Sequence, residues 1–399
     1  MISKESIRYS LRNLRQRKTR SAFTIISIFV GITTIFIFVS FGLGLYHYIG
    51  ELSSASSADK VLIQPKGLGG LDPTFSFSED ELKVVQRTSG VYEASGVYFK
   101  SAEVQKNGVV KYTSLIGYDP KAPLIMSVFN IDIYKGRELQ PGDRGVVLGY
   151  NYLVPDRIFS KPYDVNENIE INGKKIKIIG FYSAVGSAPD DAQIYVTNDY
   201  MKELYPNETL RYNWIVAKVD VSNIDRVTKD IEKNLRKKRG LDEGKEDFFV
   251  QSFDAMIESY STALNIVIGF IILIALISVF VSAVNTANTM ITSVLERVKE
   301  IGVMKSIGAE NSEIFKIFLF ESAFLGFVAG CLGVIIGWTF SFAAGKIVAS
   351  LGYGFLKPYF SPWLFVGCIV FATLTGAISG ALPARKASKV NPVDALRYE

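Results

Sequence analysis

The apolar residues of this chain are concentrated in one segment near its start and in three segments of its last third. The first covers roughly 21–45, and the others cover 264–290, 317–345 and 362–382. Each reaches the roughly 20 residues that an α-helix needs to cross the hydrocarbon core of a bilayer. The sequence therefore predicts an α-helical membrane protein with four transmembrane helices and a large domain over 46–260 between the first two.

The segment 46–260 has the pattern of a folded domain. Strand-like runs alternate with turn signals, and Asn172-Gly173 between two such runs is a strong two-residue hairpin signal. Helices are predicted over Glu79–Arg87, with Ser78 as the N-cap, and over Val227–Lys238. A segment of this length can bury a core of its own, so we expect an independently folded α+β domain.

The positions of the basic residues predict the orientation. The chain has 44 Lys and Arg against 39 Asp and Glu, a net charge of +5. Outside 46–260, the cations gather in 1–20, 291–316 and 383–399, whereas the loop 346–361 contains two lysines. Loops rich in Lys and Arg stay in the cytoplasm. We therefore expect both termini and 291–316 on the cytoplasmic side of the cell membrane and 46–260 on its extracytoplasmic side. The same distribution argues against a nucleic-acid partner.

The N-terminal residues allow two interpretations. A short helix over 4–20 is amphipathic and basic, which is typical of a segment that lies on the membrane surface and attracts anionic lipid. Alternatively, its charges serve only to fix the topology. Cleavage of the following span as a signal peptide is disfavoured, because its apolar run exceeds the usual 7–15 residues.

The residue inventory excludes several kinds of chemistry. His47 is the single histidine and borders the membrane, while Cys331 and Cys368 both lie in predicted spans. No disulfide framework, metal site, cofactor site or catalytic site is therefore predicted, and we expect no enzyme activity. A phosphate-binding G-x-x-x-x-G-K-[ST] loop does not occur in the sequence. The spans hold few ionisable groups, which disfavours an ion-coupled carrier.

Small and polar residues in the spans predict helix packing. Three G-x-x-x-G pairs allow helix backbones to approach closely, either within the chain or in a dimer. They are Gly326/Gly330, Gly333/Gly337 and Gly376/Gly380. Asn285 and Asn288 are positioned to hydrogen-bond a neighbouring helix. Glu321, near the inner end of its span, is either a boundary residue or the partner of a cation in the cytoplasmic loop.

The loop 291–316 is predicted to contain a two-faced helix. Its apolar face consists of Val294, Leu295, Val298 and Ile301, and its charged face of Glu296, Arg297, Lys299 and Glu300. The pattern ends at Gly302, where we expect a bend, and Gly308 predicts a second break.

Three segments resemble one known family. The run Glu296-Arg297-Val298-Lys299-Glu300-Ile301-Gly302, followed by Lys305 and Gly308-Ala309, is similar to the E-R-x-x-E-I-G…G-A signature of MacB/FtsX-type ABC-transporter permeases. Asn288 and Glu321 match residues of that family at its spacing. The endings Pro383–Ala387 and Pro392–Arg397 resemble its P-A-x-x-A…P-x-x-A-L-R pattern, and Asn13–Ser21 resembles its entry to the first span.

The resemblance implies a function and partners. A coupling segment would dock on a separate cytoplasmic P-loop ABC ATPase, which would bind the ATP and Mg²⁺; its residues would be Glu296, Arg297, Glu300, Ile301, Gly302, Lys305, Gly308 and Ala309. Two permeases would pair with two ATPases, and hydrolysis would move the outer domains (mechanotransmission) to export a peptide, lipoprotein, lipid or drug.

Two points are left open by the resemblance. An FtsX-like regulator that activates a cell-wall hydrolase or sensor, without transport, is the alternative function. The namesake branch fuses its ATPase to the same chain and works with an extracytoplasmic adaptor. We expect a permease without the fused ATPase here, and the adaptor is a further candidate partner.

Overall fold

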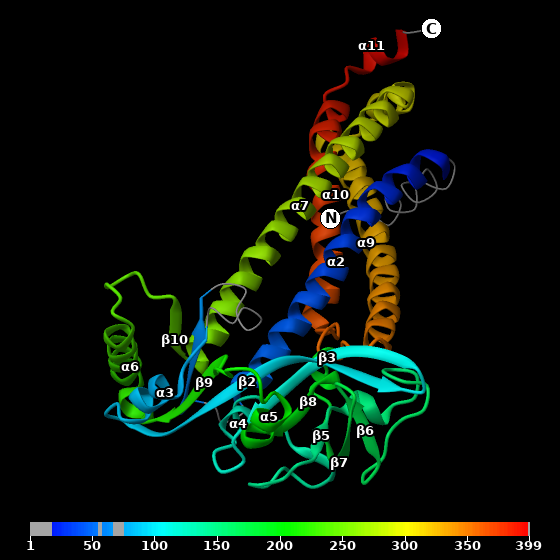
Figure 1. Cartoon of the computed structure of the whole chain (residues 1–399). Coiled ribbons are helices and arrows are strands. Elements are labelled where there is room, and N and C mark those ends of the chain that lie inside the picture. Colours follow the sequence, from blue (N-terminus) through cyan, green and yellow to red (C-terminus); the bar gives the residue numbers. More distant parts are fainter. Residues whose placement is uncertain (1–17, 55–57, 67–75, 398–399) are drawn as a thin grey trace. The chain divides into compact units, whose positions relative to one another are not determined.

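The computed structural model describes residues 18–54, 58–66 and 76–397, which divide into two compact units (Figure 1). The membrane unit comprises Met1–Leu45, Leu264–Ile347 and Lys357–Glu399. The outer unit comprises Tyr46–Ala263 and Val348–Leu356. The basic helix predicted over 4–20 lies outside the described residues, apart from its last positions, which begin the first described helix.

Among the described residues, four helices are long and apolar enough to cross a membrane. They are α2 (Lys18–Ser54), α7 (Phe253–Glu296), α9 (Asn311–Ser350) and α10 (Pro362–Ser388). Helices α7 and α9 extend beyond the spans predicted at 264–290 and 317–345, because backbone hydrogen bonding continues into polar sequence. Apolar composition marks only the part of a helix that faces hydrocarbon.

Small residues bring α9 close to α10. A Cβ added at Gly376 would lie 2.5 Å from the carbonyl oxygen of Ser322, and one at Gly330 would lie 2.8 Å from the Cβ of Ala372. A Cβ added at Gly326 would overlap the carbonyl oxygen of Ala372. At these three positions the absence of a side chain lets the two helices approach closely.

The remaining G-x-x-x-G pair of α9 faces α2. Gly333 lies against Ile32, and Gly337 lies against Phe36. All three pairs therefore contact helices of the same chain, which is the first of the two alternatives that the sequence leaves open.

Gly380 also packs against α9, through a side chain. The side chain of Ser322 in α9 occupies the space beside Gly380, and a Cβ added there would overlap the Cβ and Oγ of Ser322. The Ser322 hydroxyl lies 3.2 and 3.0 Å from the carbonyl oxygens of Phe318 and Leu319 in its own helix. A buried serine side chain therefore fills the volume that this glycine leaves.

Of the four membrane helices, α7 has the smallest buried fraction in the described chain. Only 11% of its most apolar 18-residue stretch is buried, against 44% for α9. The apolar core of the membrane unit is formed by α2, α9 and α10, through Ile28, Ile32, Phe36, Ala329, Val334, Cys368 and Ala372. One face of α7 is therefore left without a neighbour in the described chain.

The outer unit is built on a ten-stranded mixed sheet in the order β10-β1-β9-β2-β3-β8-β5-β7-β4, with β6 pairing β2 and β7. The strands are β1 (Lys60–Pro65), β2 (Val91–Lys106), β3 (Val109–Tyr118), β4 (Ile133–Gly136), β5 (Val146–Leu148), β6 (Asn168–Ile171), β7 (Lys174–Tyr182), β8 (Ile194–Thr197), β9 (Trp214–Val219) and β10 (Phe248–Ser252). Its helices are α3 (Glu79–Gln86), α4 (Leu124–Val128), α5 (Asn198–Leu204) and α6 (Ile224–Arg239).

Both faces of the central part of this sheet are buried. Successive residues of a strand point to opposite faces, and in β1 Val61 and Ile63 join one core whereas Leu62 joins the other. Residues of α3, α5 and α6 pack against the first core, and residues of α4 and the start of α7 contribute to the second. The strands therefore carry apolar residues at consecutive positions.

Several local predictions are confirmed. Ser78 caps α3 in a reciprocal arrangement with Glu81. Asn172 and Gly173 both have positive φ, 49° and 74°, and join β6 to β7. A second turn of this kind, Asn107-Gly108, joins β2 to β3 and is not among the predictions made from the sequence.

We expect Gly376→Ala to destabilise the membrane unit by about 1–3 kcal/mol, because its Cβ would overlap the α9 backbone. Gly367→Ala, in the same helix, is the matched control, since nothing lies within 4 Å of its added Cβ. Thermal unfolding of the purified chain in detergent measures both. Equal midpoints for the two variants would contradict the packing described here.

Candidate functional site

The cytoplasmic segment between α7 and α9 is broken at Arg297. Helix α7 ends at Glu296, and α8 (Val298–Ser306) follows. Arg297 has φ −114° and ψ 15°, outside the helical range. The bend predicted at Gly302 is therefore wrong, because Gly302 lies buried inside α8. The break predicted at Gly308 is confirmed, with φ 104° at that residue.

A buried ion pair explains the break. The Nη1 of Arg297 lies 3.0 Å from the Oε2 of Glu321 in α9, and the two side chains are 2% and 6% exposed. The guanidinium also lies 4.9 Å from the ring centroid of Phe318, and its Nε is 3.2 Å from Glu300. Glu321 is thus the partner of a cytoplasmic-loop cation, the second alternative that the sequence leaves open.

A second polar contact fixes α8 to α10. The Nζ of Lys305 donates hydrogen bonds to the carbonyl oxygens of Ser388, at 2.9 Å, and Val390, at 2.7 Å. Carbonyls at the end of a helix lack intrahelical donors, and a cation there is favourable. The short helix α11 (Pro392–Arg397) then packs against α8.

An apolar cluster lies between these polar contacts. It joins α7, α8, α9 and α10 through Met290, Val294, Ile301, Ile314, Phe318, Ala384 and Ala387, with Ala309 packed against it. Among the residues expected to couple to an ATPase, Arg297, Ile301 and Gly302 are therefore buried. In this structure Arg297 and Ile301 hold the segment between α7 and α9 in place through contacts with the membrane helices.

The two-faced helix predicted here is wrong in two positions. Leu295 is 66% exposed although it was assigned to the apolar face, and Arg297 is buried although it was assigned to the charged face. The prediction assumed one continuous helix, and the break at Arg297 changes the helical phase. The sequence holds no local signal for the correct outward face, because apolar residues at i, i+4, such as Val303 and Ile307, ordinarily predict a buried stripe.

The outward side of the segment is a mixed apolar and charged surface. Val303 is 50% exposed and Ile307 is 82% exposed, although both are apolar. We call this the coupling surface; it consists of Leu295, Glu296, Lys299, Glu300, Val303 and Ile307, all exposed. Exposed apolar residues rimmed by charges are typical of a protein interaction site.

Two family models match the chain. The FtsX-like permease C-terminal model matches residues 264–392, and the MacB-like periplasmic core domain model matches residues 21–234. The chain belongs to the MacB/FtsX-type ABC-transporter permeases. The prediction from the sequence is thereby confirmed, as is a multi-pass membrane protein with a large extracytoplasmic α+β domain.

The relatives of this permease differ in length. It is 32% identical over 396 residues to an uncharacterised ABC transporter permease of Methanocaldococcus jannaschii, with 98% of each chain covered. It is 26% identical to the macrolide export ATP-binding/permease protein MacB of Marinobacter nauticus, covering 99% of this chain and 61% of that one. The solved periplasmic region of MacB from Actinobacillus actinomycetemcomitans has 15% identity and a TM-score of 0.42, covering 51% of this chain and 93% of that chain.

The connection between α9 and α10 contributes to the outer unit of the permease. The backbone N–H of Phe355 donates to the carbonyl of Gly186 at 3.1 Å, and the Phe355 ring lies 5.6 Å from that of Tyr48. The sequence predicts 346–361 only as a short outer loop. In the structure, Val348–Leu356 is part of the outer unit.

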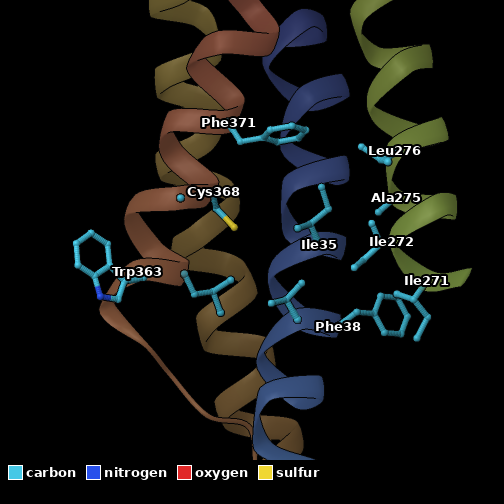
Figure 2. A pocket seen from close by; sticks show the side chains of 12 residues that line it. Ile35, Phe38, Ile271, Ile272, Ala275, Leu276, Trp363, Cys368 and Phe371 are labelled. Carbon is cyan, nitrogen blue, oxygen red and sulfur yellow. The ribbon is translucent and has the colours of Figure 1, made fainter. Parts of the chain in front are cut away.

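An apolar pocket of about 340 Å³ lies among α2, α7 and α10 (Figure 2). Ile35 and Phe38 line it from α2, Ala275 from α7, and Cys368 and Phe371 from α10. Its lining residues, all of them described, include no charged side chain. The pocket is predominantly apolar, like the hydrocarbon of a bilayer, and the indole N–H of Trp363 and the thiol of Cys368 are its polar side-chain groups.

We expect Glu321→Gln to destabilise the permease by about 2–3 kcal/mol, because Arg297 would lose its buried counter-charge and keep the half-exposed carboxylate of Glu300. The double variant Arg297→Met/Glu321→Leu should recover most of this loss. Glu313→Gln, at an exposed position of the same helix, is the control. Thermal unfolding in detergent distinguishes them, and a Glu321→Gln midpoint equal to that of Glu313→Gln would refute this assignment.

Proposed function

We propose that this permease transmits ATP hydrolysis by a separate cytoplasmic ATPase to its outer unit. The observation that carries the proposal is the coupling surface. Its residues are exposed, whereas the neighbouring Arg297 and Lys305 are held by contacts to α9 and α10. Exposed apolar residues with charged residues around them suit a protein partner whose surface also has an apolar centre and a polar rim. The ATP and Mg²⁺ would be bound by that partner.

The connectivity of the helices supports mechanical transmission. Helix α7 runs unbroken from the outer unit through Leu264–Glu296, and α9 runs from Asn311 to Ser350, which belongs to the outer unit. Displacing the coupling segment would shift both helices through the Arg297–Glu321 pair. Rigid-body movement of packed helices is a common form of conformational coupling.

The proposed cargo is one that an extracytoplasmic domain can reach. Motion delivered to an extracytoplasmic domain acts on cargo outside the inner leaflet, so a peptide, lipoprotein, lipid or drug is the proposed cargo. The name of the MacB relative includes macrolide export, which makes a macrolide-type drug the first compound to test. The FtsX-like regulator would give a wall-turnover defect on deletion, with no drug sensitivity.

We expect Ile307→Asp to abolish stimulation of the partner ATPase and to weaken its binding at least 30-fold, as for an apolar hot-spot residue worth about 2 kcal/mol. Val221→Asp makes a comparable change at an exposed site of the outer unit and is the control. Both are measured after reconstitution with the ATPase in lipid nanodiscs. Normal ATPase stimulation by Ile307→Asp would argue against docking at this surface.

We further propose a homodimer formed through the exposed face of α7. Asn285 and Asn288 are exposed on this apolar helix, and among the described residues neither carboxamide has a hydrogen-bond partner. The exposed residues alternate in steps of four and three, the spacing of a left-handed helix pair; they are Ile274, Ser278, Val281, Asn285, Asn288 and Thr292. A second copy would satisfy both amides, and it would explain why Asn288 is exposed within one chain.

We expect Asn285→Leu/Asn288→Leu to weaken the dimer about tenfold, since interhelical hydrogen bonds in membranes average about 0.6 kcal/mol each. Leu273→Ala, which is exposed beside this row of residues, should leave the dimer unchanged. Single-molecule photobleaching of the labelled permease in lipid vesicles counts the copies. A dimer fraction that is identical in all three proteins would rule out this interface.

A further inference from the structure

The hairpin of β2 and β3 has an open strand edge. β8 pairs with β3 only from Leu115 to Tyr118, so the part of β3 from Val109 to Thr113 pairs on one side alone among the described strands. This part carries exposed apolar side chains, with Tyr112 73% exposed. An edge of this kind can accept another extended chain.

The register shows which backbone groups are available. The two-residue turn Asn107-Gly108 makes Lys106 and Val109 the closing, hydrogen-bonded pair, and such pairs alternate with non-bonded pairs along the hairpin. Val110 and Tyr112 are therefore in non-bonded pairs. Their N–H and C=O groups point away from β2, toward the open edge.

A basic pocket of about 290 Å³ lies beside this edge. Lys106, Lys111 and Lys161 line it, with Asp156 as the single acid of the lining. Lys106 is fixed in place, because its Nζ donates to the carbonyls of Lys161 and Pro162 at 2.9 and 3.0 Å. Burial lowers the pKa of Lys106, and the charge of Lys161 lowers it further, while the nearby charge of Glu167 acts to raise it.

The remaining two ammonium groups are available to a ligand. Within the described residues, neither Lys111 nor Lys161 forms an ion pair. Lys111 is two positions from Val109, and both share the face of the hairpin that borders the pocket. A strand added at the open edge would place every second side chain on this same face.

We propose that the β3 edge and the lysine pocket together bind an extended acidic segment of an extracytoplasmic protein. Main-chain hydrogen bonds from Val110 and Tyr112 would supply the pairing. Carboxylates at alternate positions of the segment would lie against Lys111 and Lys161. This site does not depend on the proposed coupling to an ATPase, because every residue in it belongs to the outer unit.

The test uses the full chain in lipid nanodiscs and a fluorescent eight-residue peptide of alternating glutamate and valine. Fluorescence anisotropy should show saturable binding of one peptide per chain. Val110→Pro should weaken binding at least tenfold, because proline removes an outward N–H without breaking the hairpin. Lys111→Gln/Lys161→Gln should weaken it about fivefold, and Lys229→Gln, on an exposed turn of α6, should not.

A second measurement uses the unaltered chain, so that it does not depend on the folding of a variant. The same peptide with alternate backbone amides N-methylated should bind at least tenfold more weakly, and so should a glutamine version. Equal binding of the N-methylated peptide, or full competition by inorganic phosphate, would show a small-anion site and overturn the proposal. Absence of saturable binding by the glutamate peptide would overturn it as well.

Discussion

The buried pair of Arg297 and Glu321 determines the geometry of the cytoplasmic end of this permease. An ionised group in an apolar setting is stable only with a counter-charge and hydrogen bonds. To reach Glu321, Arg297 leaves the helical conformation, and this ends α7 and sets the phase of α8. This contact, together with the hydrogen bonds of Lys305 and the burial of Ile301, leaves Val303 of α8 and Ile307 just after it exposed.

The membrane helices give this pair a rigid setting. Glycines remove the side chains that would separate α9 from α10 and α2, so helix backbones and small side chains, such as that of Ser322 against Gly380, are in contact. Close packing of this kind transmits displacement because it has little room to relax. Helix α7 lacks such packing on one face, and its exposed Asn285 and Asn288 belong to that face.

The outer unit combines a sheet that is largely buried with an open edge on β3. Side chains cover both faces of the central strands. The edge of β3 differs, and it lies beside the lysine pocket. Lysines commonly protect a sheet edge against unwanted pairing, and here they lie beside the exposed apolar residues Val109, Val110 and Tyr112, which suit a partner of acidic and apolar composition.

The sequence by itself determined the four spans, their orientation, the outer α+β domain, the cap at Ser78 and the turn at Asn172-Gly173. These depend on composition or on residues a few positions apart, where local physical chemistry is sufficient. Only the tertiary structure decided that Arg297 is buried and Leu295 exposed, because a contact with α9, 24 residues away in the chain, overrides helical periodicity. It also decided which helices the glycines join and that Phe355 packs with the outer unit, since such contacts depend on partners that no local pattern specifies.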